Sequence, residues 1–111
     1  MKKMNHEKLT GAIGLACRAG ALAVGQQAAE DALKRGKARL LILDPSASDA
    51  SRTQWEAAAA NAGLPVLILP AEGLLGEATG RGNARAACVT DPNFIKLIRR
   101  NAETEQDSIR G

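Results

Sequence analysis

Residues 15–42 read LACRAGALAVGQQAAEDALKRGKARLLI. Each glycine in this stretch marks a boundary between one predicted helix or strand and the next. Apolar residues recur at helical spacing over residues 6–18, which predicts an amphipathic first helix. Gly20 ends that helix, as glycine commonly does just beyond a helix C-terminus. The apolar residues 21–24 then predict a short strand.

Gly25 opens the second half of the same stretch. Residues 26–35 again show helical spacing, with small apolar side chains on one side, and Gly36 ends this helix. Residues 38–43 read ARLLIL, an apolar run that predicts a buried strand. The order helix, strand, helix, strand indicates an α/β protein.

The alternation continues to the end of the chain. Turn and capping signals bound a helix over 48–61, a strand over 65–69, a helix over 72–79, a strand over 85–90 and a last helix that Asp91 caps. Short connections between alternating strands and helices predict a largely parallel sheet with helices on both faces. We therefore expect one three-layer αβα domain over residues 1–100, followed by a polar, flexible tail over 101–111.

Composition agrees with one small domain that needs no metal or disulfide. The chain has 111 residues, 45% of them hydrophobic, and its only aromatic residues are Trp55 and Phe94. Cys17 and Cys88 lie 71 positions apart in apolar surroundings without a metal-ligand pattern, so we expect buried thiols and no cofactor. No signal peptide or membrane span is recognisable, which favours a cytoplasmic location.

Positive charge occurs in two blocks. Residues 1–40 carry eight Lys/Arg against three Asp/Glu, and residues 80–100 carry five against one, whereas the segment between them is acidic. If the fold brings the two blocks together, they form a surface that attracts phosphate; otherwise the charges average out in space. Both outcomes are open from the sequence.

Candidate catalytic groups are few. The only histidine, His6, lies near the N-terminus, and the serines after position 45 occur where turn formation and helix capping explain them. Asp44 follows a strand but precedes Pro45, which favours a turn residue over a catalytic carboxylate. Gly80-Arg81-Gly82-Asn83 lacks the spacing of a nucleotide-binding loop and predicts a flexible basic loop. We therefore expect no enzyme and no small-molecule substrate.

The stretch 15–42, the sequence Leu64-Pro65-Val66 and the segment 74–80 together resemble the kink-turn RNA-binding superfamily of ribosomal proteins L-seven-Ae and L-thirty-e, most of all its bacterial YlxQ-like branch. The resemblance covers about residues 8–100. It implies an αβα sandwich around a four-stranded mixed sheet, and RNA binding without catalysis. It also implies that the start of the second helix contacts the RNA backbone and sheared G·A pairs, and that the loop before the last strand holds an extruded base.

The resemblance assigns these RNA-binding roles to the helix start and to the loop. The glycine permits close backbone approach, and the first-turn N–H groups suit an anion. With neighbouring basic residues, the expected RNA-binding residues are Gly25, Gln26, Gln27, Asp31, Lys34, Arg35, Lys37, Arg81, Gly82, Asn83 and Arg85. Arg39 is a further candidate for a phosphate contact.

The helix start departs from the family pattern Gly-x-Asn-Glu-x-x-Lys. Gln27 replaces Asn and keeps an amide, Ala28 replaces Glu and removes an acceptor for guanine donors, and Asp31 replaces Lys and reverses a charge. We expect binding of structured RNA, ribosomal or kink-turn-like, with altered specificity, and the ribosome is a candidate partner. The alternatives are a protein–protein interaction module that lost RNA binding and, less compatible with so short a chain, an enzyme fragment.

Overall fold

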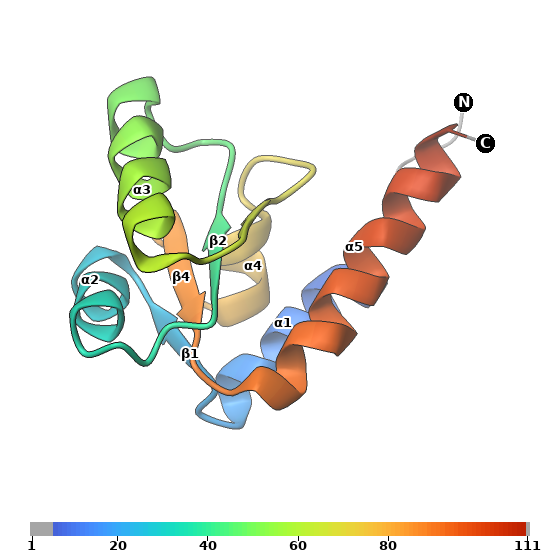
Figure 1. Cartoon of the computed structure of the whole chain (residues 1–111). Helices are drawn as coiled ribbons and strands as arrows, with labels where there is room; N and C mark the ends of the chain where they lie inside the picture. The colour runs from blue at the N-terminus through green and yellow to red at the C-terminus, as the bar shows by residue number, and fades with distance from the viewer. Residues whose placement is uncertain (1–5, 111) are drawn as a thin grey trace.

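The computed structural model describes residues 6–110, with the side chains of residues 6–102. Its helices and strands, in chain order, are α1 (Glu7–Arg18), β1 (Leu22–Val24), α2 (Gln26–Lys34), β2 (Leu40–Leu43), α3 (Asp49–Ala62), β3 (Val66–Ile68), α4 (Leu74–Thr79), β4 (Ala86–Val89), the 3-10 turn η1 (Pro92–Phe94) and α5 (Ile95–Arg110). Figure 1 shows this order. Each element that the sequence predicts is present, which confirms the α/β fold.

The four strands form one mixed sheet in the order β1-β4-β2-β3. Only β2 and β3 are parallel, and β4 runs antiparallel to both β1 and β2. The mixed sheet is confirmed, whereas a largely parallel sheet is wrong. The reason is the position of β4, which lies antiparallel between β1 and β2, so that only the β2–β3 pair is parallel.

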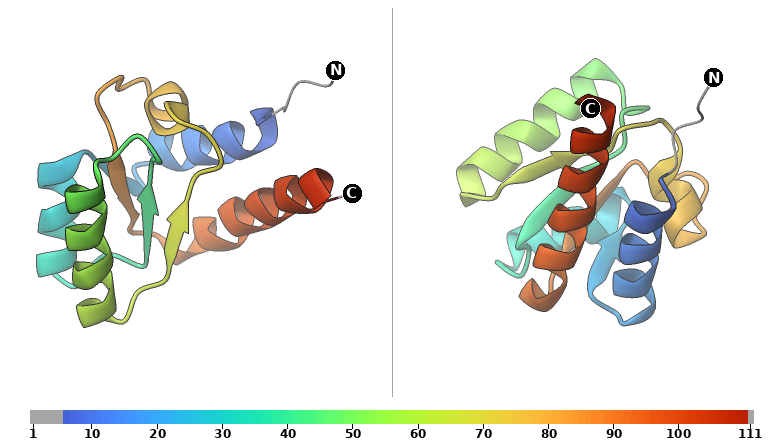
Figure 2. Two further views of the ribbon diagram at one scale, coloured as in Figure 1. Left: turned by 90° about the horizontal axis from the view of Figure 1, so that it is seen from above. Right: turned by 90° about the vertical axis from the view of Figure 1, so that its right-hand side faces the viewer.

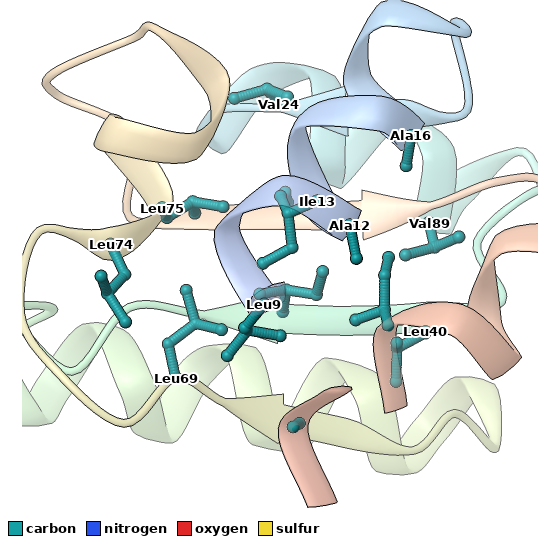
Figure 3. Packing of buried hydrophobic residues seen from close by; sticks show 14 of the residues in the cluster. Leu9, Ala12, Ile13, Ala16, Val24, Leu40, Leu69, Leu74, Leu75 and Val89 are labelled. Carbon is teal, nitrogen blue, oxygen red and sulfur yellow. The ribbon is translucent and has the colours of Figure 1, made fainter. Parts of the chain in front are cut away.

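Helices cover both faces of the sheet, as Figures 1 and 2 show. On one face, α2 and α3 pack against the sheet around Leu41, Leu43 and Trp55. On the other face, α1, α4 and α5 enclose Leu40, Ile42 and their neighbours, and Figure 3 shows this larger core. Successive residues of β2 point to opposite faces, so one uninterrupted apolar strand supplies both cores.

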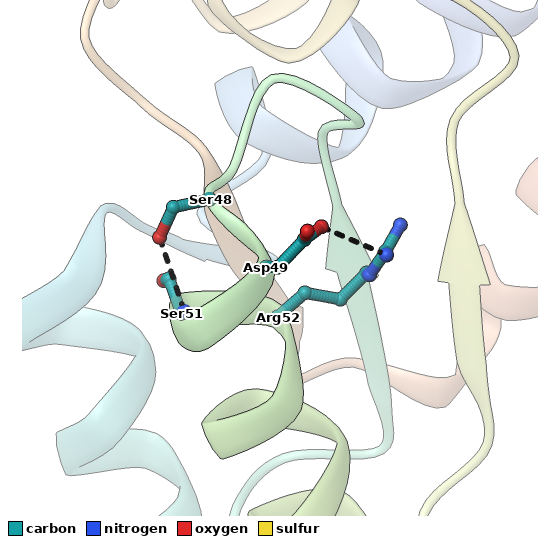
Figure 4. A network of polar contacts seen from close by, with 4 residues as sticks. All are labelled: Ser48, Asp49, Ser51 and Arg52. Atoms are coloured by element: carbon teal, nitrogen blue, oxygen red, sulfur yellow. Dashed lines mark hydrogen bonds and ion pairs between the residues drawn. The ribbon is translucent and has the colours of Figure 1, made fainter.

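Helix α3 begins and ends with the capping groups that the sequence predicts. The Ser48 hydroxyl accepts a hydrogen bond of 3.1 Å from the Ser51 N–H, and Asp49 pairs with Arg52 at 3.2 Å (Figure 4). Gly63 ends the helix with φ of 70°, a left-handed conformation that glycine adopts without steric cost. The cap fixes where the chain leaves the carboxyl end of β2 and turns into α3.

The last helix is longer than expected. Helix α5 continues to Arg110, through the residues for which the sequence predicts a tail. Residues 101–110 contain Ala, Glu and Gln, which favour helix, and no Gly or Pro interrupts them. Ile98 and Ala102 anchor the helix in the larger core.

Two features are absent from the part of the chain that the structure describes: a helix that could cross a membrane and a cluster that could hold a metal ion. None of its helices has the length and apolar character to cross a membrane. Among the side chains that the structure describes, residues 6–102, the acidic, histidine and cysteine groups form no cluster that could hold a metal ion. Cys88 lies in the core beside α2, its thiol donates to the Ala29 carbonyl at 3.6 Å, and burial raises its pKa to about 11.

Candidate nucleic-acid interface

One end of the sheet gathers three helix N-termini and the loop of residues 80–85. Strands β1, β2 and β3 all end there, and α2, α3 and α4 begin there. The 80–85 loop enters β4 at the same end, since the Gly25 N–H donates to the Ala86 carbonyl at 2.9 Å and the Asp44 N–H donates to the Arg85 carbonyl at 2.9 Å. We call this region the carboxyl end of the sheet.

The three helices that begin at the carboxyl end differ in how their first turns are capped. Ser48 caps α3, and the carboxylate of Asp44 accepts from the N–H groups of Gly73 and Leu75 at the start of α4, each at 3.0 Å. Helix α2 begins at Gly25, which has no side-chain cap. The first-turn N–H groups of α2 therefore remain open to an external acceptor, next to the positive end of the helix dipole.

Gly25 adopts a backbone conformation that is accessible mainly to glycine. Its φ of 95° and ψ of 163° lie in a region that side-chain-bearing residues rarely adopt. A Cβ at this position would meet no heavy atom within 4 Å. The glycine is thus required by the turn, and the space in front of it is open.

Asp44 is a structural carboxylate. It is 1% exposed and also accepts from the N–H and the hydroxyl of Ser46, at 3.0 and 2.6 Å. Burial alone would raise the pKa of Asp44, but the hydrogen bonds from Ser46, Gly73 and Leu75 outweigh it and hold the pKa below the usual value. The sequence prediction of a turn residue is confirmed, and its second role, joining β2 to α4, could not be seen in local sequence.

The 80–85 loop packs against α4 through a glycine that the sequence did not identify as important. A Cβ on Gly76 would lie 3.0 Å from the Arg81 carbonyl oxygen and 3.1 Å from Gly82 Cα. Such contacts are too short for any larger residue without movement of the loop backbone. Gly76 therefore allows the loop to lie directly over α4 and to reach β4 at Ala86.

The loop presents its polar residues to solvent. The candidate residues Arg81, Gly82, Asn83 and Arg85 are all exposed, while Ala84 is buried and anchors the loop. The Ala84 N–H donates to the Arg81 carbonyl at 3.0 Å, which closes a turn. The loop thus carries two exposed arginines, and it enters β4 next to the uncapped start of α2.

The exposed side of α2 is polar and of mixed charge. Gln26, Gln27, Glu30, Asp31 and Lys34 line an open hollow of about 470 Å³. Asp31 is paired with Arg35, whose Nε lies 3.1 Å from its carboxylate. The candidate Arg35 therefore has an acidic partner within its own helix, which reduces its availability to a phosphate.

The remaining basic candidates lie away from the carboxyl end. Arg39 pairs with the far end of β4, where its N–H donates to the Val89 carbonyl at 2.7 Å, and Lys37 precedes it. Lys34 is about 12 Å along α2 from Gln26. Positive side chains at this end complement the helix C-terminal dipole. The fold thus brings Gly25, Gln26 and Gln27 beside the 80–85 loop but leaves Lys37 and Arg39 at the opposite end of the sheet.

Comparison with known proteins identifies relatives of this arrangement. The model of the Ribosomal protein L7Ae/L30e/S12e/Gadd45 family matches residues 7–98. A protein of unknown function from Bacillus halodurans has a TM-score of 0.78 and 24% identity, covering 86% of this chain and 97% of that one. The Giardia lamblia 15.5kD RNA binding protein has a TM-score of 0.71 and 16% identity, covering 96% and 92%.

At these identities the two solved structures show a shared fold. No curated protein sequence matches the chain. The family model is more informative, because it extends from the first residue of α1 into α5 and includes the carboxyl end with its open helix and its loop. On that match, and in agreement with the resemblance seen in the sequence, the chain belongs to the ribosomal protein L7Ae/L30e/S12e/Gadd45 family.

Proposed function

We propose that the protein binds structured RNA without catalysing a reaction on it. Membership of a family of ribosomal proteins and the fold shared with an RNA-binding protein from Giardia lamblia support this function. The RNA backbone would contact the start of α2, while Arg81 and Arg85 would contribute charge from the 80–85 loop. A ribosomal RNA partner would make this a cytoplasmic, ribosome-associated protein.

The single observation that carries the proposal is the uncapped N-terminus of α2 beside an exposed basic loop. Of the three helices starting at the carboxyl end, only α2 has no side chain on its first-turn N–H groups. Gly25 removes any side chain that would hinder a phosphate there, and its N–H bond to Ala86 fixes the helix start against the loop's end. An anion can therefore receive backbone hydrogen bonds at the start of α2, and the arginine-bearing loop that enters β4 next to it would add positive charge.

The proposed specificity differs from that of typical kink-turn binders. Gln27 keeps the hydrogen-bonding groups of the expected Asn, whereas Ala28 offers no acceptor to guanine. Asp31 is an exposed carboxylate where a lysine is expected, and its pairing with Arg35 offsets part of its repulsion of phosphate. We therefore infer looser recognition of folded RNA rather than stringent recognition of sheared G·A pairs.

The direct test is titration of labelled RNA at near-physiological salt. A kink-turn hairpin and ribosomal RNA fragments would be compared with a fully paired duplex of equal length, and binding followed by fluorescence anisotropy. We expect the folded RNAs to bind more tightly than the duplex, with affinity falling as salt rises. Absence of binding to every one of these RNAs would reject the proposal and favour a protein–protein interaction module.

A further inference from the structure

A groove runs between α2 and α3 from the carboxyl end of the sheet. Residues at helical spacing on both helices line it, beginning with Gln26 on α2 and Ser51 on α3. Its volume is about 200 Å³. Because drug-sized pockets measure roughly 300–1,000 Å³, this groove suits one planar ring or one side chain.

The groove has an apolar floor and a polar rim. Leu33, Trp55 and Ala58 supply the floor, while the amides of Gln26 and Gln54 lie among the lining groups. Side-chain amides provide donors and acceptors that can pair with the edge of a base. The floor suits the face of a heterocycle, since unstacked bases in RNA are commonly held against apolar or aromatic side chains.

Charge in the groove favours a neutral group over a phosphate. The lining includes one acid, Glu30, and one base, Lys34, so the groove has no excess of positive charge. A phosphate would meet repulsion from Glu30, whereas a base would not. Phosphates are better placed at the start of α2, which leaves the groove for a base of the same RNA.

Trp55 provides a second, independent observation. The side chain is 8% exposed, yet among the described residues no group accepts a hydrogen bond from its indole N–H. The indole N–H can therefore donate to a bound acceptor. Since Trp55 lines the groove, a base carbonyl or ring nitrogen can supply that acceptor.

We propose that the α2–α3 groove receives one unpaired nucleobase of the RNA whose backbone contacts the start of α2. The inference rests on the proposed RNA-binding function and adds a base subsite to it. Gln26 links the two, because it belongs to the first turn of α2 and also lines the groove. The favoured RNA would then contain a bulged or loop nucleotide that leaves the stack on the α3 side of the bound backbone.

Trp55 is also the reporter of the test, because it is the only tryptophan and the chain has no tyrosine. Intrinsic fluorescence therefore comes from Trp55 alone. The probe is an unlabelled kink-turn hairpin, compared with hairpins in which each unpaired nucleotide is replaced in turn by an abasic one. We expect saturating hairpin to change Trp55 emission, and one abasic position to abolish that change.

Matched variants on α3 add a second readout. Ala58→Leu fills the groove, whereas Ala57→Leu places the same added volume on an exposed position of the same helix. By the usual contribution of one base contact, Ala58→Leu should weaken hairpin binding roughly tenfold, and Ala57→Leu should change it less than about twofold. Circular dichroism melting of both variants establishes that each is folded.

The outcomes separate this inference from the proposed function. If the labelled hairpin binds to saturation in the anisotropy assay but Trp55 emission does not change, and the two leucine variants bind equally well, the groove holds no base. The groove is then open to another occupant, such as a side chain of a protein partner. If no RNA binds the unmodified protein, the proposed function itself fails. The Trp55 emission measurement uses the unmodified protein, so it still tests whether the groove holds a base if Ala58→Leu does not fold.

Discussion

The carboxylate of Asp44 accepts a hydrogen bond of 3.0 Å from the backbone N–H of Leu75, 31 positions further along the chain. This bond joins the end of β2 to the first turn of α4, from which the 80–85 loop follows. The geometry of the carboxyl end of the sheet therefore depends on one buried carboxylate. Its hydrogen bonds are made to the ionised form, so they also make the stability of the fold depend on pH.

Asp44→Ala should lower the free energy of unfolding by about 1–3 kcal/mol, because it leaves the N–H groups of Gly73 and Leu75 without their acceptor. Urea denaturation followed by circular dichroism measures the change. Glu56→Gln, at an exposed position of α3, is the control and should change stability by less than about 0.5 kcal/mol. Equal effects of the two substitutions would contradict the role of Asp44.

The same carboxylate predicts a specific loss of stability in acid. Because the pKa of Asp44 is lowered in the folded state, its contribution is complete above the ordinary carboxyl pKa of 3.8 and is lost as pH falls through the lowered value. Denaturation curves between pH 3 and 7 should therefore show a steeper decline for the unmodified protein than for Asp44→Asn. Parallel declines would show that Asp44 does not contribute to the acid sensitivity.

Gly76→Ala should weaken RNA binding without a change in charge. The added methyl group would lie 3.0 Å from the Arg81 carbonyl oxygen, so the 80–85 loop must move away from α4. We expect stability to fall by about 1–3 kcal/mol, as for other overpacked sites, together with a measurable loss of affinity in the anisotropy assay. Gly11→Ala, where a Cβ meets nothing within 4 Å, should leave affinity unchanged.

Arg85→Glu should reduce RNA affinity and its dependence on salt more than Arg39→Glu does. The two arginines carry the same charge, but Arg85 precedes β4 at the carboxyl end and Arg39 precedes β2 at the opposite end. Loss of one phosphate contact lowers the slope of log affinity against log salt by about 1. Similar slopes for both variants would show that the whole basic surface binds RNA without preference for one end.

Asp31→Lys combined with Ala28→Glu restores the two charged residues of the family pattern at the start of α2 and leaves Gln27 in place of Asn. The lysine removes repulsion from phosphate and frees Arg35 from its ion pair, and the glutamate adds an acceptor for guanine. We expect the double variant to prefer the kink-turn hairpin over a paired duplex by at least about tenfold more than the unmodified protein does. Glu56→Gln on α3, which also raises the net charge by one, is the control for added charge, and an equal gain there would attribute the effect to net charge alone.

The sequence by itself determined the elements and the glycine-led start of α2, to which we assign RNA binding as a proposal. Glycines that end helices, the capping residues Ser48 and Asp91, and apolar runs act locally, so element order follows from neighbours in the chain. The motif at Gly25 was recognisable because glycine is required where φ is positive at the start of α2. Local rules also misplaced the end of α5, where polar but helix-favouring residues continue the helix to Arg110.

The tertiary structure alone decided which of these segments meet. Pairing of β4 between β1 and β2 made the sheet mixed, placed Arg85 beside Gly25 and left Lys37 at the other end. The bond from Leu75 to Asp44, the close approach at Gly76 and the α2–α3 groove all join residues separated in sequence by other elements or turns. Such contacts depend on strand direction and helix packing, which spacing along the chain does not specify.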